Sequence, residues 1–91
     1  MKKIAVVSLR FAPGHLAHLR AYYKLFSDLG CNARLFLDRK YNIFFHDEDY
    51  IDFIDSSDAI LSWSPNLVLS YNVSNKNIKL ALACKKSRIP F

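Results

Sequence analysis

The first thirty residues constrain the fold of this chain more than any other segment. Residues 4–9 form a near-continuous apolar run, which is typical of a strand covered on both faces of a parallel sheet. Pro13 and Gly14 interrupt that run, and apolar residues then recur at steps of three and four. These residues are Leu16, Leu19, Tyr23, Phe26 and Leu29. Gly30 suits the left-handed position that ends a helix. The segment therefore predicts a strand, a turn, and a helix from His15 to Leu29.

Two further strands and one helix follow the same logic. Residues 33–37 and 67–71 are apolar runs of the buried-strand type, and residues 75–86 have a helical pattern with Ser74 as its N-cap. The helix is predicted to turn Ile78, Ala81, Leu82 and Cys84 toward the core. Strand, helix and strand joined by short connections form a βαβ unit with a right-handed crossover. We predict an α/β fold, a Rossmann-like three-layer α/β/α arrangement with a mostly parallel sheet.

The middle of the chain leaves several structures open. Residues 41–45 are aromatic and fit a strand or a packed loop. Residues 47–54 fit a short helix and an extended segment equally well, and residues 56–58 are a break or an N-cap. The pattern over 41–64 therefore does not decide its secondary structure.

The length of 91 residues fits one domain, residues 1–91. Residues 88–91 look like the start of another strand, and natural domains protect open sheet edges. We therefore expect this chain to be the truncated N-terminal portion of a longer protein.

Charge is distributed unevenly along the chain. The net charge is +5, but six of the eight acidic residues fall between positions 47 and 58, a segment without Lys or Arg. The remainder carries thirteen bases against Asp28 and Asp38, a balance of +11. A basic surface attracts phosphates, anionic lipid or nucleic acid, and it is equally typical of a solvated surface.

Cysteine usage and hydropathy suggest the compartment. Cys31 and Cys84 lack metal-type spacing and read as reduced structural thiols. The apolar run after Lys2 and Lys3 is too short for a signal core, and no run approaches the ~20 apolar residues of a membrane span. We expect a cytoplasmic protein, with the inner face of the membrane as an alternative place.

The predicted topology places a ligand site. Open parallel sheets bind ligands beyond the carboxyl ends of their strands, where the strand order reverses. The first βαβ unit places strand 33–37 on one side of the first strand, so we expect strand 67–71 on the other side, and the crevice is then flanked by residues 10–15 and 72–75. Backbone N–H groups at the helix start favour an anion there. The candidate substrate- or phosphate-binding residues are Arg10, Gly14, His15, Asn72 and Ser74. Gly14 either lets the backbone approach a phosphate or simply makes a tight turn.

Several other chemistries lack their motifs. No Gly-x-Gly-x-x-Gly, Walker loop or Gly-x-Ser-x-Gly elbow occurs, which argues against NAD, ATP and a serine hydrolase. His15 and His18 could share a helix face, but no third ligand accompanies them, so we expect no metal site. Asp52 and Asp55 fit a solvated acidic face better than a hydrolase carboxylate pair. Basic and aromatic residues interleave at 20–24, yet no RNA-binding signature is present, so we expect no nucleic-acid partner.

Three segments together resemble a known family. Lys3-Ile4-Ala5-Val6-Val7-Ser8, then Pro13-Gly14-His15 and a helix ending in Leu29-Gly30, resemble the N-terminal half of GT-B glycosyltransferases, most of all the GT4-like group of bacterial polysaccharide assembly. Residues 65–72 resemble its Pro-Asp-hydrophobic strand, and residues 86–91 its lysine-rich helix end and following Ile-Pro strand. The resemblance spans most of the chain and is weakest over 41–64.

The resemblance implies a retaining transferase of the hexosyltransferase type. It would move sugar from a nucleotide-sugar donor, a substrate rather than a cofactor, to a saccharide or lipid-linked acceptor. In that family the N-terminal half shapes the acceptor side, and the loop matching Pro13 to His15 approaches the donor diphosphate. The donor nucleotide and an acidic motif belong to the C-terminal half, so we expect no activity from this chain alone. A basic surface would also suit a lipid-linked acceptor at a peripheral membrane surface.

An alternative belongs to another class of protein. The chain would then be a complete, non-catalytic α/β interaction module that pairs with a partner, or with itself, through an exposed sheet edge. Gene sequence beyond Phe91 separates the two: a second α/β half supports the transferase, and a stop codon supports the module.

Overall fold

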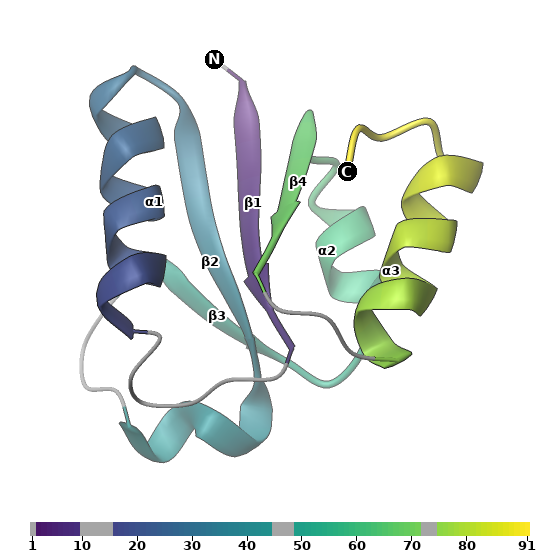
Figure 1. Ribbon diagram of the computed structural model, residues 1–91, viewed down its shortest axis with the longest axis horizontal. Coiled ribbons are helices and arrows are strands. Elements are labelled where there is room, and N and C mark those ends of the chain that lie inside the picture. The colour runs from purple at the N-terminus through teal and green to yellow at the C-terminus, as the bar shows by residue number, and fades with distance from the viewer. Residues whose placement is uncertain (1, 10–15, 45–48, 72–74) are drawn as a thin grey trace.

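Four parallel strands form the centre of the fold (Figure 1). The structure is a computed structural model that describes residues 2–9, 16–44, 49–71 and 75–91. The elements in chain order are β1 (Lys3–Ser8), α1 (Leu16–Asp28), β2 (Asn32–Asp38), the 3-10 helix η2 (Arg39–Phe44), β3 (Ile51–Ile54), α2 (Asp58–Ser62), β4 (Leu67–Ser70) and α3 (Asn75–Lys86). These bounds match the sequence-predicted strands and helices to within one or two residues.

The sheet has the strand order β3-β2-β1-β4, and all three strand pairs are parallel. β1 is therefore central and pairs with β2 on one side and β4 on the other. Helix α1 covers one face of the sheet, and α2 and α3 cover the opposite face (Figure 1). The predicted three-layer α/β/α architecture with a parallel sheet is confirmed.

The core divides into two halves because successive strand residues point to opposite faces of the sheet. Ile4 and Val6 of β1 pack with Leu19 on the α1 side. Ala5 and Val7 pack with Ile60, Leu80 and Cys84 on the side of α2 and α3. Ala5, Val6 and Val7 are fully buried, as a strand covered on both faces requires.

Two of the predicted core positions on α3 are wrong. Leu80 and Cys84 are fully buried against the sheet, whereas Ile78 is 54% and Leu82 is 64% exposed. The helix carries two apolar stripes at i, i+4 spacing, and only one can face the sheet. Cys84 is placed as predicted, and Ala81 is half-buried.

The predicted stripe of α1 is correct over most of its length. Leu19 is fully buried, and Tyr23 and Phe26 pack against the same core. Leu29 is 68% exposed, which contradicts its predicted core position, because it lies beyond the last residue of α1. Gly30 has φ +85°, so the predicted left-handed helix end is confirmed.

The structure decides most of the ambiguous middle segment. Residues 41–44 belong to the 3-10 helix η2, so they form neither the strand nor the packed loop that the sequence suggested. Residues 51–54 form β3, which is the extended alternative. Ser57 is the N-cap residue of α2, although its side chain makes no capping hydrogen bond. Instead the Ser56 Oγ accepts a hydrogen bond from the Asp58 backbone N–H at 3.1 Å.

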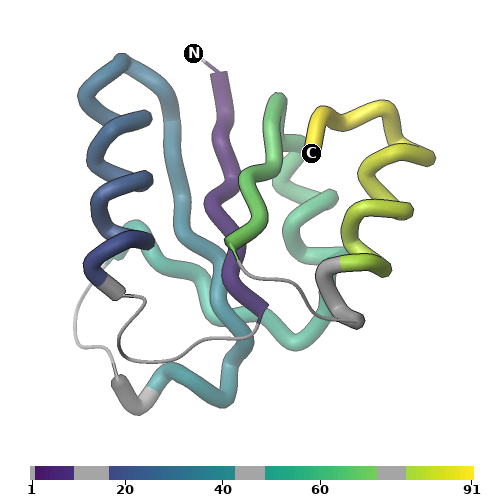
Figure 2. The backbone as a smooth tube through the Cα atoms, in the orientation of Figure 1, coloured from purple at the N-terminus to yellow at the C-terminus, as the bar shows by residue number. Residues whose placement is uncertain are grey.

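The carboxyl-terminal residues lie beside β4 (Figure 2). Residues 88–91 form no strand, contrary to the expectation that they begin one. A single backbone contact has the geometry of strand pairing, since the Val68 N–H donates to the Pro90 carbonyl at 2.8 Å. One hydrogen bond is too few to form a strand ladder, and the segment remains irregular.

Candidate ligand site at the carboxyl edge of the sheet

The strand order reverses at β1 and β4. The chain leaves β1 for α1 on one face, and it leaves β4 for α3 on the other. Their carboxyl ends are neighbours, since Val7 aligns with Ser70 and the Tyr71 N–H donates to the Val7 carbonyl at 2.8 Å. This is the topological position at which open α/β sheets bind ligands. The predicted placement of strand 67–71 beside β1 is therefore confirmed.

All five predicted site residues lie outside the described part of the chain. Arg10, Gly14 and His15 belong to the connection from β1 to α1, and Asn72 and Ser74 to that from β4 to α3. The flanking residues are described, and both connections start at the same edge of the sheet. The roles of these five residues remain predictions.

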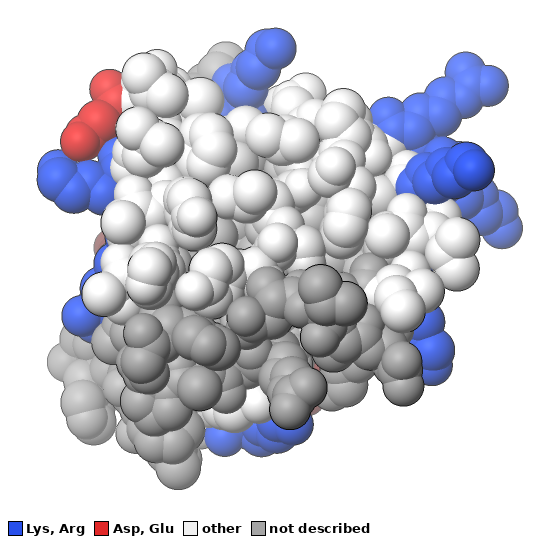
Figure 3. Space-filling view, in the orientation of Figure 1, with Lys and Arg blue, Asp and Glu red and all other residues white. Residues whose placement is uncertain are grey.

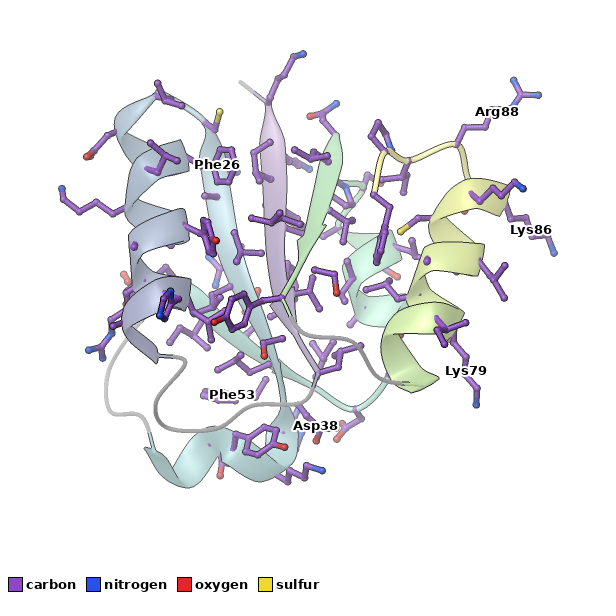
Figure 4. All side chains as sticks on the ribbon, in the orientation of Figure 1. Phe26, Asp38, Phe53, Lys79, Lys86 and Arg88 are labelled. Atoms are coloured by element: carbon purple, nitrogen blue, oxygen red, sulfur yellow. The ribbon has the colours of Figure 1, made fainter. Side chains whose placement is uncertain are left out.

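A pocket of about 250 Å³ opens at this edge, on the face covered by α2 and α3. Its lining comes from the ends of three strands and from α3: Leu9, Asp38, Ile54, Asp55, Ser56, Ser57 and Lys79. Leu9 and Ile54 are buried and form its apolar wall. Figure 4 shows Asp38 at this edge, where β2 ends. The pocket combines two carboxylates, two hydroxyls and an ammonium group around an apolar base.

Neighbouring groups hold the pocket carboxylates in place. The Arg39 Nε–H donates to Asp55 Oδ1 at 3.0 Å and Oδ2 at 3.2 Å, and Arg39 Nη2 donates to the Phe53 carbonyl at 3.0 Å. Asp38 Oδ1 accepts a hydrogen bond from the Lys40 backbone N–H at 3.2 Å. These contacts orient the two carboxylates at the edge of the sheet.

Sequence reasoning did not identify the pocket residues as a site. One signal was available: Asp38 ends β2, and Asp55 directly follows β3. Carboxyl ends of neighbouring parallel strands meet at one edge of a sheet, so polar residues there are candidates for ligand contact. The considered pairing of Asp52 with Asp55 on a helix does not occur, because Asp52 lies within β3 and binds Arg34.

Aromatic rings lie on the opposite face at the same edge. The rings of His18 and Tyr71 stack with centroids 5.9 Å apart and an interplanar angle of 20°, and Tyr22 approaches Tyr71 at 6.2 Å. Tyr71 directly follows β4, and His18 lies in the first turn of α1. His18 is thus a stacking partner. Across the residues that the structure describes, no three His, Cys, Asp or Glu side chains gather as metal ligands would.

Comparison with known proteins leaves the family open. No protein-family model, curated protein or solved structure matches the chain. Among the described helices, none is long and apolar enough to cross a membrane.

Proposed function

We propose that this chain is the acceptor-side portion of a GT-B glycosyltransferase. The whole protein would transfer a sugar from a nucleotide-sugar donor to a hydroxyl of a saccharide or lipid-linked acceptor, releasing the nucleoside diphosphate and a proton. The observation that carries this proposal is the strand order, which puts β4 beside β1. The Gly14 loop and residues 72–74 consequently leave neighbouring strand ends, where the resembled family brings together donor diphosphate and acceptor.

The pocket supports a saccharide as the ligand on this side. Carboxylates accept hydrogen bonds from sugar hydroxyls. Asp38 and Asp55 place two carboxylates in the pocket lining. Leu9 and Ile54 offer an apolar wall for the C–H face of a ring. The volume of about 250 Å³ is below the roughly 300–1,000 Å³ of pockets for drug-sized ligands. A single sugar unit fits this size class better than a complete nucleotide sugar does.

The two glycines of the chain provide the test. In the full-length protein, Gly14→Leu would obstruct the backbone approach to the diphosphate, and we expect kcat/KM for sugar-nucleotide turnover to fall by at least about tenfold. Gly30→Ala is the matched control, because it changes a helix end outside the site. It should reduce stability and leave the KM for the donor unchanged. Unaltered turnover by Gly14→Leu would remove the loop from the proposed site.

The interaction module remains the alternative proposal. The Val68 N–H on the outer side of β4 binds the Pro90 carbonyl, so this edge can pair with an extended segment. In the present structure that segment belongs to the same chain, and a partner strand would have to replace it. Sedimentation of the purified chain over a concentration series distinguishes the two, because self-pairing raises the apparent mass with concentration and a transferase portion does not require it.

A further inference from the structure

Helix α3 turns an apolar stripe toward solvent. Leu80 and Cys84 are fully buried against the sheet, and Ile78 and Leu82 lie on the opposite side of the helix, 54% and 64% exposed. Residues four apart lie on one helix face, so Ile78 and Leu82 form a continuous pair. Two large aliphatic side chains therefore lie next to each other on the outer face of α3.

Cations surround this pair and acids are absent from the segment. Lys85 continues the stripe at one further turn, and Lys79 and Lys86 flank it along one side, seven residues apart. Arg88 follows the helix end, and no Asp or Glu occurs after Asp58 in the sequence. Figure 3 shows Lys and Arg side chains gathered over α3, and Figure 4 shows Lys79, Lys86 and Arg88 pointing away from the sheet.

We propose that this outer face of α3 binds the surface of an anionic lipid bilayer. Ile78 and Leu82 would enter the boundary between headgroups and acyl chains, and Lys79, Lys85 and Lys86 would contact lipid phosphates. A helix with an apolar stripe bordered by lysines is the form that interfacial helices take. Each lysine near an anionic leaflet adds to the attraction. The proposal stands independently of the transferase activity.

Charge makes a second copy of this chain a poorer occupant than an anionic surface. Symmetric packing of two α3 helices would bring their lysines together. Head-to-tail packing would need the acidic segment of the other copy as the acceptor of these cations. Two of the six acids of that segment, Asp52 and Asp55, already bind Arg34 and Arg39 at 2.6 Å and 3.0 Å. An anionic partner outside the chain therefore suits the surface better.

A nucleic acid would contact the lysines of this surface but not its apolar pair. Single strands bind through cationic grooves combined with aromatic side chains on which bases stack. Helix α3 contains no aromatic residue, and its outermost side chains are aliphatic. A bilayer uses both the lysines and the apolar pair, and it binds a convex helix face without a groove.

Vesicle flotation of the complete chain tests the proposal. We expect binding to vesicles of phosphatidylglycerol and phosphatidylcholine at low salt, little binding to phosphatidylcholine alone, and loss of binding as salt rises. Ile78→Gln with Leu82→Gln should lower the partition coefficient about tenfold. Lys85→Gln with Lys86→Gln should lower it roughly thirtyfold. All four positions are exposed, so thermal unfolding should change little and a failure to fold is separable from lost binding.

Matched controls come from other surfaces of the molecule. Leu25→Gln replaces an aliphatic side chain that is 53% exposed on α1, and Lys24→Gln with Lys40→Gln removes the same charge as the α3 lysine pair. These variants should bind vesicles almost as the parent does. Equal binding to both vesicle types, unchanged binding of both α3 variants, or equal losses in the controls would overturn the proposal. Binding to a single-stranded oligonucleotide that exceeds vesicle binding would replace it with a nucleic-acid surface.

Discussion

Helices α1 and α3 end in the same backbone geometry with different residues. Gly30 and Arg88 both adopt the left-handed region, at φ +85° and +60°. In each case the next N–H bonds back into the last turn, from Cys31 to the Phe26 carbonyl at 3.0 Å and from Ile89 to the Cys84 carbonyl at 2.8 Å. A residue with a Cβ atom pays about 1–2 kcal/mol for this conformation. Glycine avoids that cost but loses ~0.4–1 kcal/mol through its greater freedom when unfolded.

Subtracting the two terms leaves a net preference for glycine of about 1 kcal/mol at both positions. We therefore expect Arg88→Gly to be more stable than Arg88→Ala by about 1 kcal/mol. Both variants lose the same guanidinium group, so their difference isolates the backbone. Gly30→Ala should be less stable than the parent by a similar amount. No atom lies within 4 Å of a Cβ built at position 30, so a clash cannot account for that loss.

Urea unfolding measures these differences as free energies, and thermal unfolding provides a second readout. For a domain of this size, 1 kcal/mol corresponds to a shift of about 4–8 °C in Tm. Ser87 supplies the control, because it is exposed and adjacent to Arg88 but does not have positive φ. Ser87→Ala should be at least as stable as Ser87→Gly. The reasoning fails if Arg88→Ala matches Arg88→Gly, or if position 87 shows the same preference for glycine.

Two further predictions concern buried and half-buried groups. Asp52 accepts two hydrogen bonds from Arg34, at 2.6 Å and 3.0 Å, and this interaction raises the pKa of Arg34. Arg34→Gln and Asp52→Asn should each lower the free energy of unfolding by about 1 kcal/mol after allowance for solvent exposure. The double variant should lower it by less than the sum of the two single losses. Strictly additive losses in urea unfolding would contradict the pairing. Burial raises the pKa of the Cys84 thiol, so the unfolded chain releases this proton first. The protonated Cys84 thiol therefore contributes its full share to stability below the thiol pKa of the unfolded chain, about 8.5, and this share is lost as the pH rises above that value. Cys84→Ala should show a smaller fall in stability between about pH 8 and 10, and a thiol reagent should label the half-buried Cys31 before Cys84.

The segments with a single clear periodicity could be predicted from the sequence. β1 has an unbroken apolar run because helices cover both faces of the sheet around it. Helix α3 has the predicted bounds, 75–86, because its apolar residues recur at helical spacing and no β-branched run competes. The position of β4 beside β1 was predicted because the first βαβ unit already places β2 on the other side of β1, and the register confirms it.

The remaining features depend on tertiary packing. The stripe of Ile78 and Leu82 and the stripe of Leu80 and Cys84 have the same spacing, so periodicity cannot tell which one faces the sheet. Segment 51–54 forms a strand because β2 offers it a partner in register, with Leu35 aligned to Ile51. The pocket assembles residues from position 9 to position 79, and no local motif connects them.

Lys79 connects the two proposals, because it lines the pocket and also flanks the exposed stripe of α3. If α3 lies on a bilayer, the pocket opens beside the headgroup layer, and an acceptor saccharide carried on a lipid can reach it without leaving the membrane. Substitution of Lys79 would therefore alter membrane binding and the pocket at the same time, so vesicle binding of such a variant could not be assigned to either surface. Lys85 and Lys86 separate the two effects, since neither lines the pocket. Vesicle binding lost with Lys85→Gln and Lys86→Gln, together with unchanged saccharide binding, would assign the membrane surface to α3 alone; loss of both would show that the two surfaces act together.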